Sequence, residues 1–376
     1  MTTSIWEKES FFEHQDIIIV GSGFAGLWSA YFLCRKHKKA KITIVEKEPI
    51  PTGASTRNAG FACFGSLTEL LADEQVLGTK AMLMLVEMRQ KGLERISKSF
   101  SSKSIDYKNT GGYELFAKSE DRKTADLEAQ VEYLNNLLKP VIKTKPFSLL
   151  GKGTRRFGFK DITHIVKNKP EGQLHPGKLA KELIKYLQCK GVHFLNGVNV
   201  TGFEEYNGKV QVQTDCSYPL TANKLLICNN GLSSGLLPHI STVPARGQVL
   251  LTSCIDNLPW KGTFHFDEGY YYFRNLGNKV LLGGARNKAF ADEKTFSLET
   301  SDLIQQELER FLHEVILPGK TYTIDHRWSG TMGMGNSKLP DISQVSDKVF
   351  AILNLGGIGV AMAPYLGKEA ATLMKM

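Results

Sequence analysis

A short glycine-rich motif between two apolar segments places the strongest constraint on the fold of this chain. Residues 16–20 read Asp-Ile-Ile-Ile-Val, and residues 21–26 read Gly-Ser-Gly-Phe-Ala-Gly, which fits the pattern G-x-G-x-x-G. The apolar, β-branched run predicts a strand that is buried on both faces. Helical spacing follows over 27–35, and a second strand of the same kind is predicted over 41–45. Strand, helix and strand within about 30 residues form a βαβ unit, so the sequence predicts a Rossmann-like domain.

Each glycine of this motif has a physical role in a dinucleotide site. Gly21 permits a tight turn, Gly23 lets the backbone approach a pyrophosphate at the helix N-terminus, and Gly26 allows close packing of helix and strand. Glu46 follows the second strand, 20 residues after Gly26. A carboxylate at this place binds ribose hydroxyls and disfavours a 2′-phosphate, so NADP is not the expected ligand.

The segment after the second strand favours FAD over NAD. Residues 53–60 read Gly-Ala-Ser-Thr-Arg-Asn-Ala-Gly, which is small, polar and flanked by glycine. A simple NAD dehydrogenase would continue directly into its next βαβ unit, whereas this loop returns to the cofactor.

Together these two motifs resemble the D-amino-acid oxidase superfamily of FAD enzymes, which includes glycine, sarcosine and gamma-glutamylputrescine oxidases. Further stretches resemble the motifs of that superfamily in the same order. They lie at 244–248, 269–274, 282–284, 328–341 and 355–360.

The resemblance implies a set of contacts to non-covalently bound FAD. The pyrophosphate, adenosine, ribityl and flavin contacts would come from Gly21, Gly23, Phe24, Ala25, Gly26, Glu46, Lys47, Ser55, Arg57, Asn58, Ala59, Gly60, Val200, Asn230, Gly231, Gly357, Ile358, Gly359, Val360 and Ala361. The implied reaction is hydride transfer from a C–H beside an amine nitrogen to the flavin, followed by imine hydrolysis and reoxidation by oxygen.

On the substrate side, the resemblance points to Tyr272, with Tyr270 on the same strand face, as groups that line the pocket. Packing within the sheet is an equal alternative for both tyrosines. Arg274 could reach the pocket or could lie in solvent at the end of a strand, and His265 is interpreted as structural.

Two departures from the superfamily bear on the substrate and the acceptor. The W-x-G motif of its amino-acid oxidases is followed by an arginine that binds the α-carboxylate, whereas this chain has no arginine there and would present Met332 or Met334 instead. We therefore expect an amine, or a substrate whose carboxylate is remote. Leu281 stands where sarcosine oxidases have a lysine near the flavin, which leaves oxidase and dehydrogenase activity both open.

Two other functions remain open from the sequence. One is a flavoenzyme that acts on a modified tRNA base, which is compatible with 47 Lys and Arg against 38 Asp and Glu and a net charge of +9. The other is a dinucleotide-binding regulatory module without catalysis. The charge is mild for a chain of 376 residues, so nucleic acid is not the expected partner.

We predict an α/β fold, α+β overall, with two discontinuous domains. A Rossmann-like FAD-binding domain would comprise 1–100, 165–240 and 325–376, and a smaller substrate domain with a mainly antiparallel sheet would comprise 101–164 and 241–324. Additional helices are predicted over 77–100, 120–138, 176–190 and 301–314, and strands over 110–117, 192–194, 209–214 and 225–228.

Cysteine usage and apolar patterning suggest where the protein works. The six cysteines form no C-x-x-C pair, so no metal site is expected and free thiols in a reducing cytosol are the simpler interpretation. Neither a signal peptide nor a membrane span is expected, and the predicted location is the cytoplasm. The sequence makes no prediction of oligomeric state.

Overall fold

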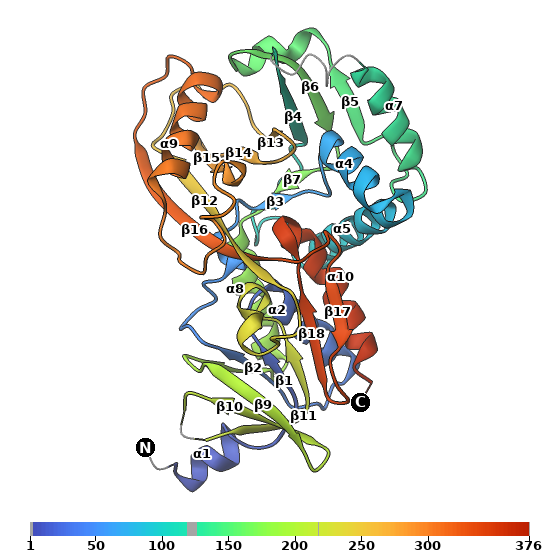
Figure 1. The fold of residues 1–376 in the computed structure, drawn as a ribbon, viewed down its shortest axis with the longest axis vertical. Helices are drawn as coiled ribbons and strands as arrows, with labels where there is room; N and C mark the ends of the chain where they lie inside the picture. The colour runs from blue at the N-terminus through green and yellow to red at the C-terminus, as the bar shows by residue number, and fades with distance from the viewer. Residues whose placement is uncertain (1–2, 119–125, 217, 376) are drawn as a thin grey trace.

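The strands of the protein gather mainly in two large mixed sheets. The computed structural model describes residues 3–118, 126–216 and 218–375. Figure 1 shows one sheet in the lower half of the view and the other in the upper half. This arrangement confirms the predicted α/β fold with a Rossmann-like part and a second, mainly antiparallel sheet.

The first sheet contains the predicted βαβ unit. Its order is β17-β18-β11-β1-β2-β8, and β10 pairs with both β11 and β9. The path from β18 to β8 is parallel, whereas β17, β10 and β9 pair in antiparallel fashion. The strands are β1 (Gln15–Val20), β2 (Ile42–Glu46), β8 (His193–Asn196), β9 (Val200–Tyr206), β10 (Lys209–Thr214), β11 (Leu220–Ile227), β17 (Asp341–Gln344) and β18 (Val349–Leu353).

Strand β1 lies in the middle of this sheet because its side chains are apolar on both faces. Ile17 and Ile19 pack into the same core as helix α2 (Phe24–Lys36), and Ile18 packs into a second core on the opposite face. All three isoleucines are fully buried. Burial on both faces is what the continuous apolar run predicts.

The second sheet has the order β16-β12-β15-β14-β13-β4-β6-β5. Neighbouring strands are antiparallel except for β13 and β4, which are parallel. The strands are β4 (Gly112–Ala117), β5 (Phe147–Leu150), β6 (Ile162–Asn168), β12 (Val243–Thr252), β13 (Thr263–Phe266), β14 (Tyr271–Leu276), β15 (Lys279–Gly284) and β16 (Ile324–Met334). A separate small sheet pairs β3 (Phe61–Ala62) with β7 (Gly172–Gln173).

The predicted helices are present with shifted ends, and the structure contains further helices that the sequence does not predict. The sequence does not predict α1, α3 or α4, and the part of the predicted helix over 120–125 lies outside the described residues. The α-helices are α1 (Ile5–Ser10), α2, α3 (Ala54–Arg57), α4 (Leu67–Leu77), α5 (Thr79–Ser99), α7 (Leu127–Leu137), α8 (Pro176–Cys189), α9 (Asp302–Phe311) and α10 (Gly359–Leu373). Among the described residues, no helix combines the length and apolar character needed to cross a membrane.

The sheet pairing bears on the predicted domain boundaries. Strand β16 pairs with β12, and β6 pairs with β4, so both belong to the second sheet. The sequence assigns 325–376 and 165–240 to the FAD-binding domain, which cuts through both strands. The division into two discontinuous domains remains a prediction.

Candidate active site

A cavity of about 570 Å³ lies at the carboxyl ends of β1 and β2 and extends to the start of α10. It collects residues from segments far apart in the chain. The predicted residues that line it are Gly21, Gly23, Phe24, Ala25, Glu46, Lys47, Ser55, Asn58, Val200, Asn230, Gly231, Met332, Gly357, Gly359 and Val360. The other predicted residues, which are not part of this lining, are Gly26, Arg57, Ala59, Gly60, Tyr270, Tyr272, Arg274, Ile358 and Ala361.

The carboxylate of Glu46 is held at one end of the cavity. Its Oε2 accepts hydrogen bonds from the backbone N–H of Ser22 at 3.0 Å and from the Ser22 hydroxyl at 2.6 Å. Its Oε1 accepts from the N–H of Glu48 at 3.1 Å. These bonds fix the orientation of a carboxylate that is almost fully buried. The role of Ser22 is not evident from the motif, in which any residue can occupy that position.

The N-terminus of α2 faces the cavity without an acidic residue in its first turn and without a capping side chain on Gly23. Ser55 from the loop after β2 reaches this helix end, where its Oγ accepts from the N–H of Phe24 at 2.8 Å. Free N–H groups at a helix start form an anion site. Gly26 has a different role, since a Cβ there would lie 2.0 Å from the carbonyl oxygen of Gly21.

The loop over 53–60 is held by its own side chains and by β16. The Asn58 side chain accepts from the N–H of Gly60 at 2.8 Å and donates to Ala54 and Ser55 carbonyls. Arg57 donates to the carbonyl of Ser329 at 2.9 Å, and Trp328 Nε1 donates to the carbonyl of Arg57 at 2.9 Å. Beside the cavity, these contacts join the loop that follows β2 of the first sheet to β16 of the second sheet.

Arg274 lies behind the same loop rather than in solvent. Its Nη1 donates to the carbonyls of Gly60 at 3.3 Å and Leu174 at 3.0 Å, and to the side chain of Gln173 at 3.4 Å. Only 5% of the residue is exposed, and burial lowers the pKa of Arg274 to about 10. The exposed position considered for Arg274 is therefore wrong, and the guanidinium braces backbone carbonyls.

Tyr272 and Met332 meet over Gly247. A Cβ on Gly247 would lie 3.7 Å from the Tyr272 hydroxyl oxygen and 3.3 Å from Met332 Cε. The ring of Tyr272 also contacts that of Phe61, with centroids 5.9 Å apart. Burial raises the pKa of Tyr272 to about 12, against an opposing effect of Arg286, so this phenol remains protonated at neutral pH.

Tyr270 does not share the face of Tyr272. It precedes β14 at the end of a turn in which Asp267 and Gly269 have positive φ. Strand alternation therefore does not extend back to it. Its ring lies 5.8 Å from that of Phe290, and it packs against the core that contains Tyr271.

Leu281 belongs to an apolar cluster beside these residues. It is buried with Ala59, Val249 and Leu251, and Phe61, Tyr272 and Trp328 pack against the group. A side chain in this environment offers no charge, which distinguishes the site from one with a lysine there.

A buried polar cluster lies behind Phe61. The Oε1 atom of Glu171 accepts from the N–H groups of Phe64 at 3.1 Å and Gly65 at 3.2 Å, and Oε2 lies 3.6 Å from Nε2 of His265. Cys63 is the third member, and the three ligand-type atoms lie within 4.8 Å of one another. Burial and then the neighbouring acids raise the pKa of the Cys63 thiol well above its ordinary value. We therefore interpret the cluster as a His–Glu ion pair beside a neutral thiol.

Substituting His265 with glutamine is expected to destabilise the protein by about 2 kcal/mol near pH 6 and by less near pH 8. Burial lowers the pKa of His265, but Glu171, Glu69 and Glu114 together raise it above its ordinary value. A raised folded-state pKa stabilises the fold below the unfolded pKa, and this contribution is lost as pH rises through the folded value. Chemical unfolding at several pH values measures the difference, with exposed His193→Gln as the control. A difference that grows with pH would contradict the ion pair.

The far end of the cavity is formed by α10 and by the short helix η3 (Asn230–Gly235). Gly357, Gly359 and Val360 line it at the start of α10, whose first turn carries no acidic residue. Ala361 lies on the other side, because its carbonyl oxygen would be 1.7 Å from a Cβ on Gly92 of α5. This close approach requires a glycine at position 92, so that α5 and α10 can pack together.

Several cavity residues have no signal in the sequence. Thr331, Asn229, Phe296 and Leu298 all line the cavity. The buried atoms Thr331 Oγ1 and Asn229 Oδ1 have no hydrogen-bond partner among the described residues. Unpartnered buried polar atoms are rare in native proteins, so they indicate that the cavity is built for a polar ligand. A cavity whose polar groups were all hydrogen-bonded within the protein would have no free group left to bind a polar ligand.

Comparison with known families decides between the remaining possibilities. The sequence profile of the DAO family, described as FAD dependent oxidoreductase, matches residues 16–373. The chain belongs to the DAO family of FAD-dependent oxidoreductases. A dinucleotide-binding module outside this enzyme family is thereby excluded, and the cofactor of this DAO-family enzyme is FAD.

The DAO-family relatives cover nearly the whole chain. It is 25% identical over 381 residues to a probable oxidoreductase, OrdL, of Haemophilus influenzae, which covers 96% of this chain and 82% of the relative. It is 24% identical over 375 residues to the gamma-glutamylputrescine oxidoreductase of Escherichia coli, covering 96% and 83%. The crystal structure of L-proline dehydrogenase from P. horikoshii has the same fold, with a TM-score of 0.76, 17% identity and coverage of 96% and 94%.

Proposed function

We propose that this DAO-family enzyme oxidises the C–N bond of an amine or amino acid. When bound, FAD supplies an acceptor for the hydride that leaves the carbon beside the nitrogen. The observation that carries the proposal is that Met332 and the loop over 53–60 line the dinucleotide cavity, while Tyr272 lies next to Met332 just outside this lining. Hydrolysis of the resulting imine would give a carbonyl compound and an amine or ammonia.

The residues that would hold FAD follow the length of the cavity. Gly21, Gly23 and the N–H groups at the start of α2 would bind the diphosphate, because a helix N-terminus stabilises negative charge. Glu46 would accept from the adenosine ribose. The start of α10 would face the flavin. Cys228 lines the cavity, but burial raises the pKa of its thiol, which supports non-covalent attachment.

Tyr272 is the residue we assign to the substrate. Its protonated hydroxyl can donate a hydrogen bond, and its ring and that of Phe61 wall off one side. Among the described residues that line the cavity, the carboxylates are Glu46 and Glu48, both at the β2 end. A substrate amine would therefore reach the site in its neutral form, which is the form that can release a hydride.

The nearby arginines favour a substrate without an α-carboxylate. Arg246 is paired with Glu293, Arg274 donates to backbone carbonyls, and Arg57 donates to the carbonyls of Thr52 and Ser329. Met332 presents a thioether where an arginine would bind a carboxylate. Arg286, which stacks on Phe290 with 4.9 Å from Cζ to the ring centroid, is the cation that could bind a remote carboxylate.

The names of two relatives represent both substrate classes. Gamma-glutamylputrescine is an amine with a remote carboxylate, and proline is an amino acid. By the arginine pairing above, we favour the amine. Leu281 stands where sarcosine oxidases have a lysine near the flavin. Without that positive charge, oxygen and another electron acceptor are both candidates for reoxidation. Action on a tRNA base has no support of its own, because the described residues that line the cavity include a single cationic side chain, Lys47.

Anaerobic addition of candidate donors to the purified flavoprotein tests the proposal. Bleaching of the flavin near about 450 nm reports reduction. The panel contains polyamines, their γ-glutamyl derivatives, glycine, sarcosine, proline and D-amino acids, with air admitted afterwards. We expect an amine without an α-carboxylate to bleach the flavin fastest, and Tyr272→Phe to slow that bleaching by about tenfold.

Each outcome assigns a different property. Bleaching by small α-amino acids alone would contradict the amine preference and would direct attention to Arg286. A flavin that no donor reduces would contradict the proposed reaction. Rapid return of colour in air would identify an oxidase, and slow return would identify a dehydrogenase with another acceptor.

A further inference from the structure

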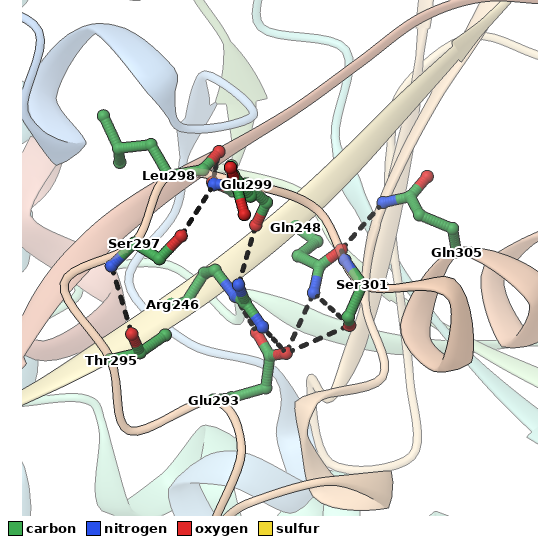
Figure 2. A network of polar contacts seen from close by, with 10 residues as sticks. Arg246, Gln248, Glu293, Thr295, Ser297, Leu298, Glu299, Ser301 and Gln305 are labelled. Atoms are coloured by element: carbon green, nitrogen blue, oxygen red, sulfur yellow. Dashed lines mark hydrogen bonds and ion pairs between the residues drawn. The ribbon is translucent and has the colours of Figure 1, made fainter.

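The segment between β15 and α9 is irregular but is fastened to the second sheet by buried polar contacts. Figure 2 shows this network, in which Arg246 and Gln248 of β12 bind residues 293–301. Arg246 and Glu293 are 7% and 1% exposed. Charged groups are almost never buried this far unless they are paired.

The central contact is a bidentate ion pair. Arg246 Nε donates to Glu293 Oε2 at 2.9 Å, and Nη2 donates to Oε1 at 2.6 Å. The third nitrogen, Nη1, donates to the carbonyl of Glu299 at 2.7 Å. Gln248 donates to Glu293 at 2.9 Å and accepts from the N–H of Ser301 at 3.0 Å. Residues 293–301 are thus attached to β12 at both of their ends, through Glu293 and Ser301.

Residues 295–299 form the tip of the segment, and hydroxyl groups within it fix its shape. The N–H of Ser297 donates to Thr295 Oγ1 at 3.1 Å, and the N–H of Glu299 donates to Ser297 Oγ at 3.2 Å. The carbonyl of Leu298 accepts from Ser329 Oγ of β16 at 2.6 Å. These bonds leave the tip little freedom to move away from β16.

Two large apolar side chains occupy this tip. Phe296 and Leu298 are 49% and 42% exposed, and both line the cavity. Neither belongs to a hydrophobic core of the described residues. The apolar surface at the tip therefore faces the cavity instead of stabilising the sheet behind it.

We propose that Phe296 and Leu298 form an apolar cover on bound FAD, and that the Arg246–Glu293 pair is the positioning device that holds this cover in place. A buried ion pair is weak support for stability, because desolvation offsets much of the attraction. Its effect here is to fix one conformation of the tip. The inference rests on the proposed location of FAD, and it adds residues that the family motifs do not include.

The test uses the holoenzyme of a Phe296→Ser/Leu298→Ser double variant. Its control is Leu276→Ser/Leu303→Ser, in which side chains of similar exposure, 41% and 51%, lie outside the cavity. We expect the first variant to bind FAD about tenfold more weakly and its flavin fluorescence to be quenched more strongly by iodide. The control is expected to match the wild type in both measurements.

Glu293→Gln tests the positioning device. If it folds, we expect iodide to quench the flavin more strongly than in the wild type, although Phe296 and Leu298 are both still present. The conservative variant Glu293→Asp is expected to show intermediate quenching. If it does not fold, the serine double variant alone decides. Equal quenching in the double variant and the wild type overturns the inference. A wild type that binds no FAD at all instead contradicts the proposed function.

Discussion

Replacing Gly26 with valine is expected to leave the purified protein without bound FAD. A Cβ at this position would lie 2.0 Å from the carbonyl oxygen of Gly21 and 3.3 Å from Ile19 Cγ2. Nonbonded heavy atoms cannot approach so closely, so α2 would have to move away from β1. The N–H groups at the start of α2 would move with it, away from the diphosphate that they are proposed to bind.

The measurement is the flavin content of the purified variant, followed by titration of the apoprotein with FAD. We expect affinity to fall by at least about 100-fold, which corresponds to roughly 2.7 kcal/mol. Ser97→Val is the control, because it places the same β-branched residue at an exposed helical position. A Gly26→Val protein with full flavin content would show that α2 is not required in its present place.

Replacing Glu171 with alanine is expected to lower the free energy of unfolding by about 4 kcal/mol. The carboxylate is fully buried, accepts from the N–H groups of Phe64 and Gly65, and pairs with His265. Removing it leaves two buried donors and a buried imidazole without their acceptor, and it opens a cavity. Each of these effects is destabilising.

Chemical unfolding measures this change. Glu171→Gln retains an acceptor oxygen and is expected to lose less than half as much stability, whereas the exposed Glu132→Ala on α7 is expected to change it by under about 0.5 kcal/mol. A loss for Glu171→Ala no larger than that for Glu132→Ala would mean that the polar cluster behind Phe61 contributes nothing to the fold.

The part of the fold that the sequence predicts well is local. Strand β1, helix α2 and strand β2 follow from an apolar run, a glycine motif and helical spacing within about 30 residues, and the structure shifts their ends by only a few positions. The strand pairing of the second sheet is harder to predict from sequence, because β4 pairs in parallel with β13, which lies about 150 residues further along the chain. No local pattern specifies that pairing.

The candidate site divides in the same way. Backbone contacts at glycine motifs are predictable, since the residue type itself states the need for close approach. Arg274 is not, because its acceptors are carbonyls at Gly60 and Leu174, distant in sequence. Tyr270 differs because a turn with positive φ interrupts the alternation that a strand would impose. Phe296 and Leu298 resemble any apolar loop residues until their segment is placed over the cavity.

The order of strands in the first sheet also has a consequence for biosynthesis. β1, from the first 20 residues, pairs with β11, and β11 pairs in turn with β18 at 349–353. The first sheet therefore cannot be completed until residues 349–353 have left the ribosome. Until then residues 225–227 of β11 lack their partner β18, although residues 220–222 already pair with β10, and unpaired apolar edges are sites of aggregation. Because these pairings join segments far apart in the sequence, we expect this sheet to form slowly.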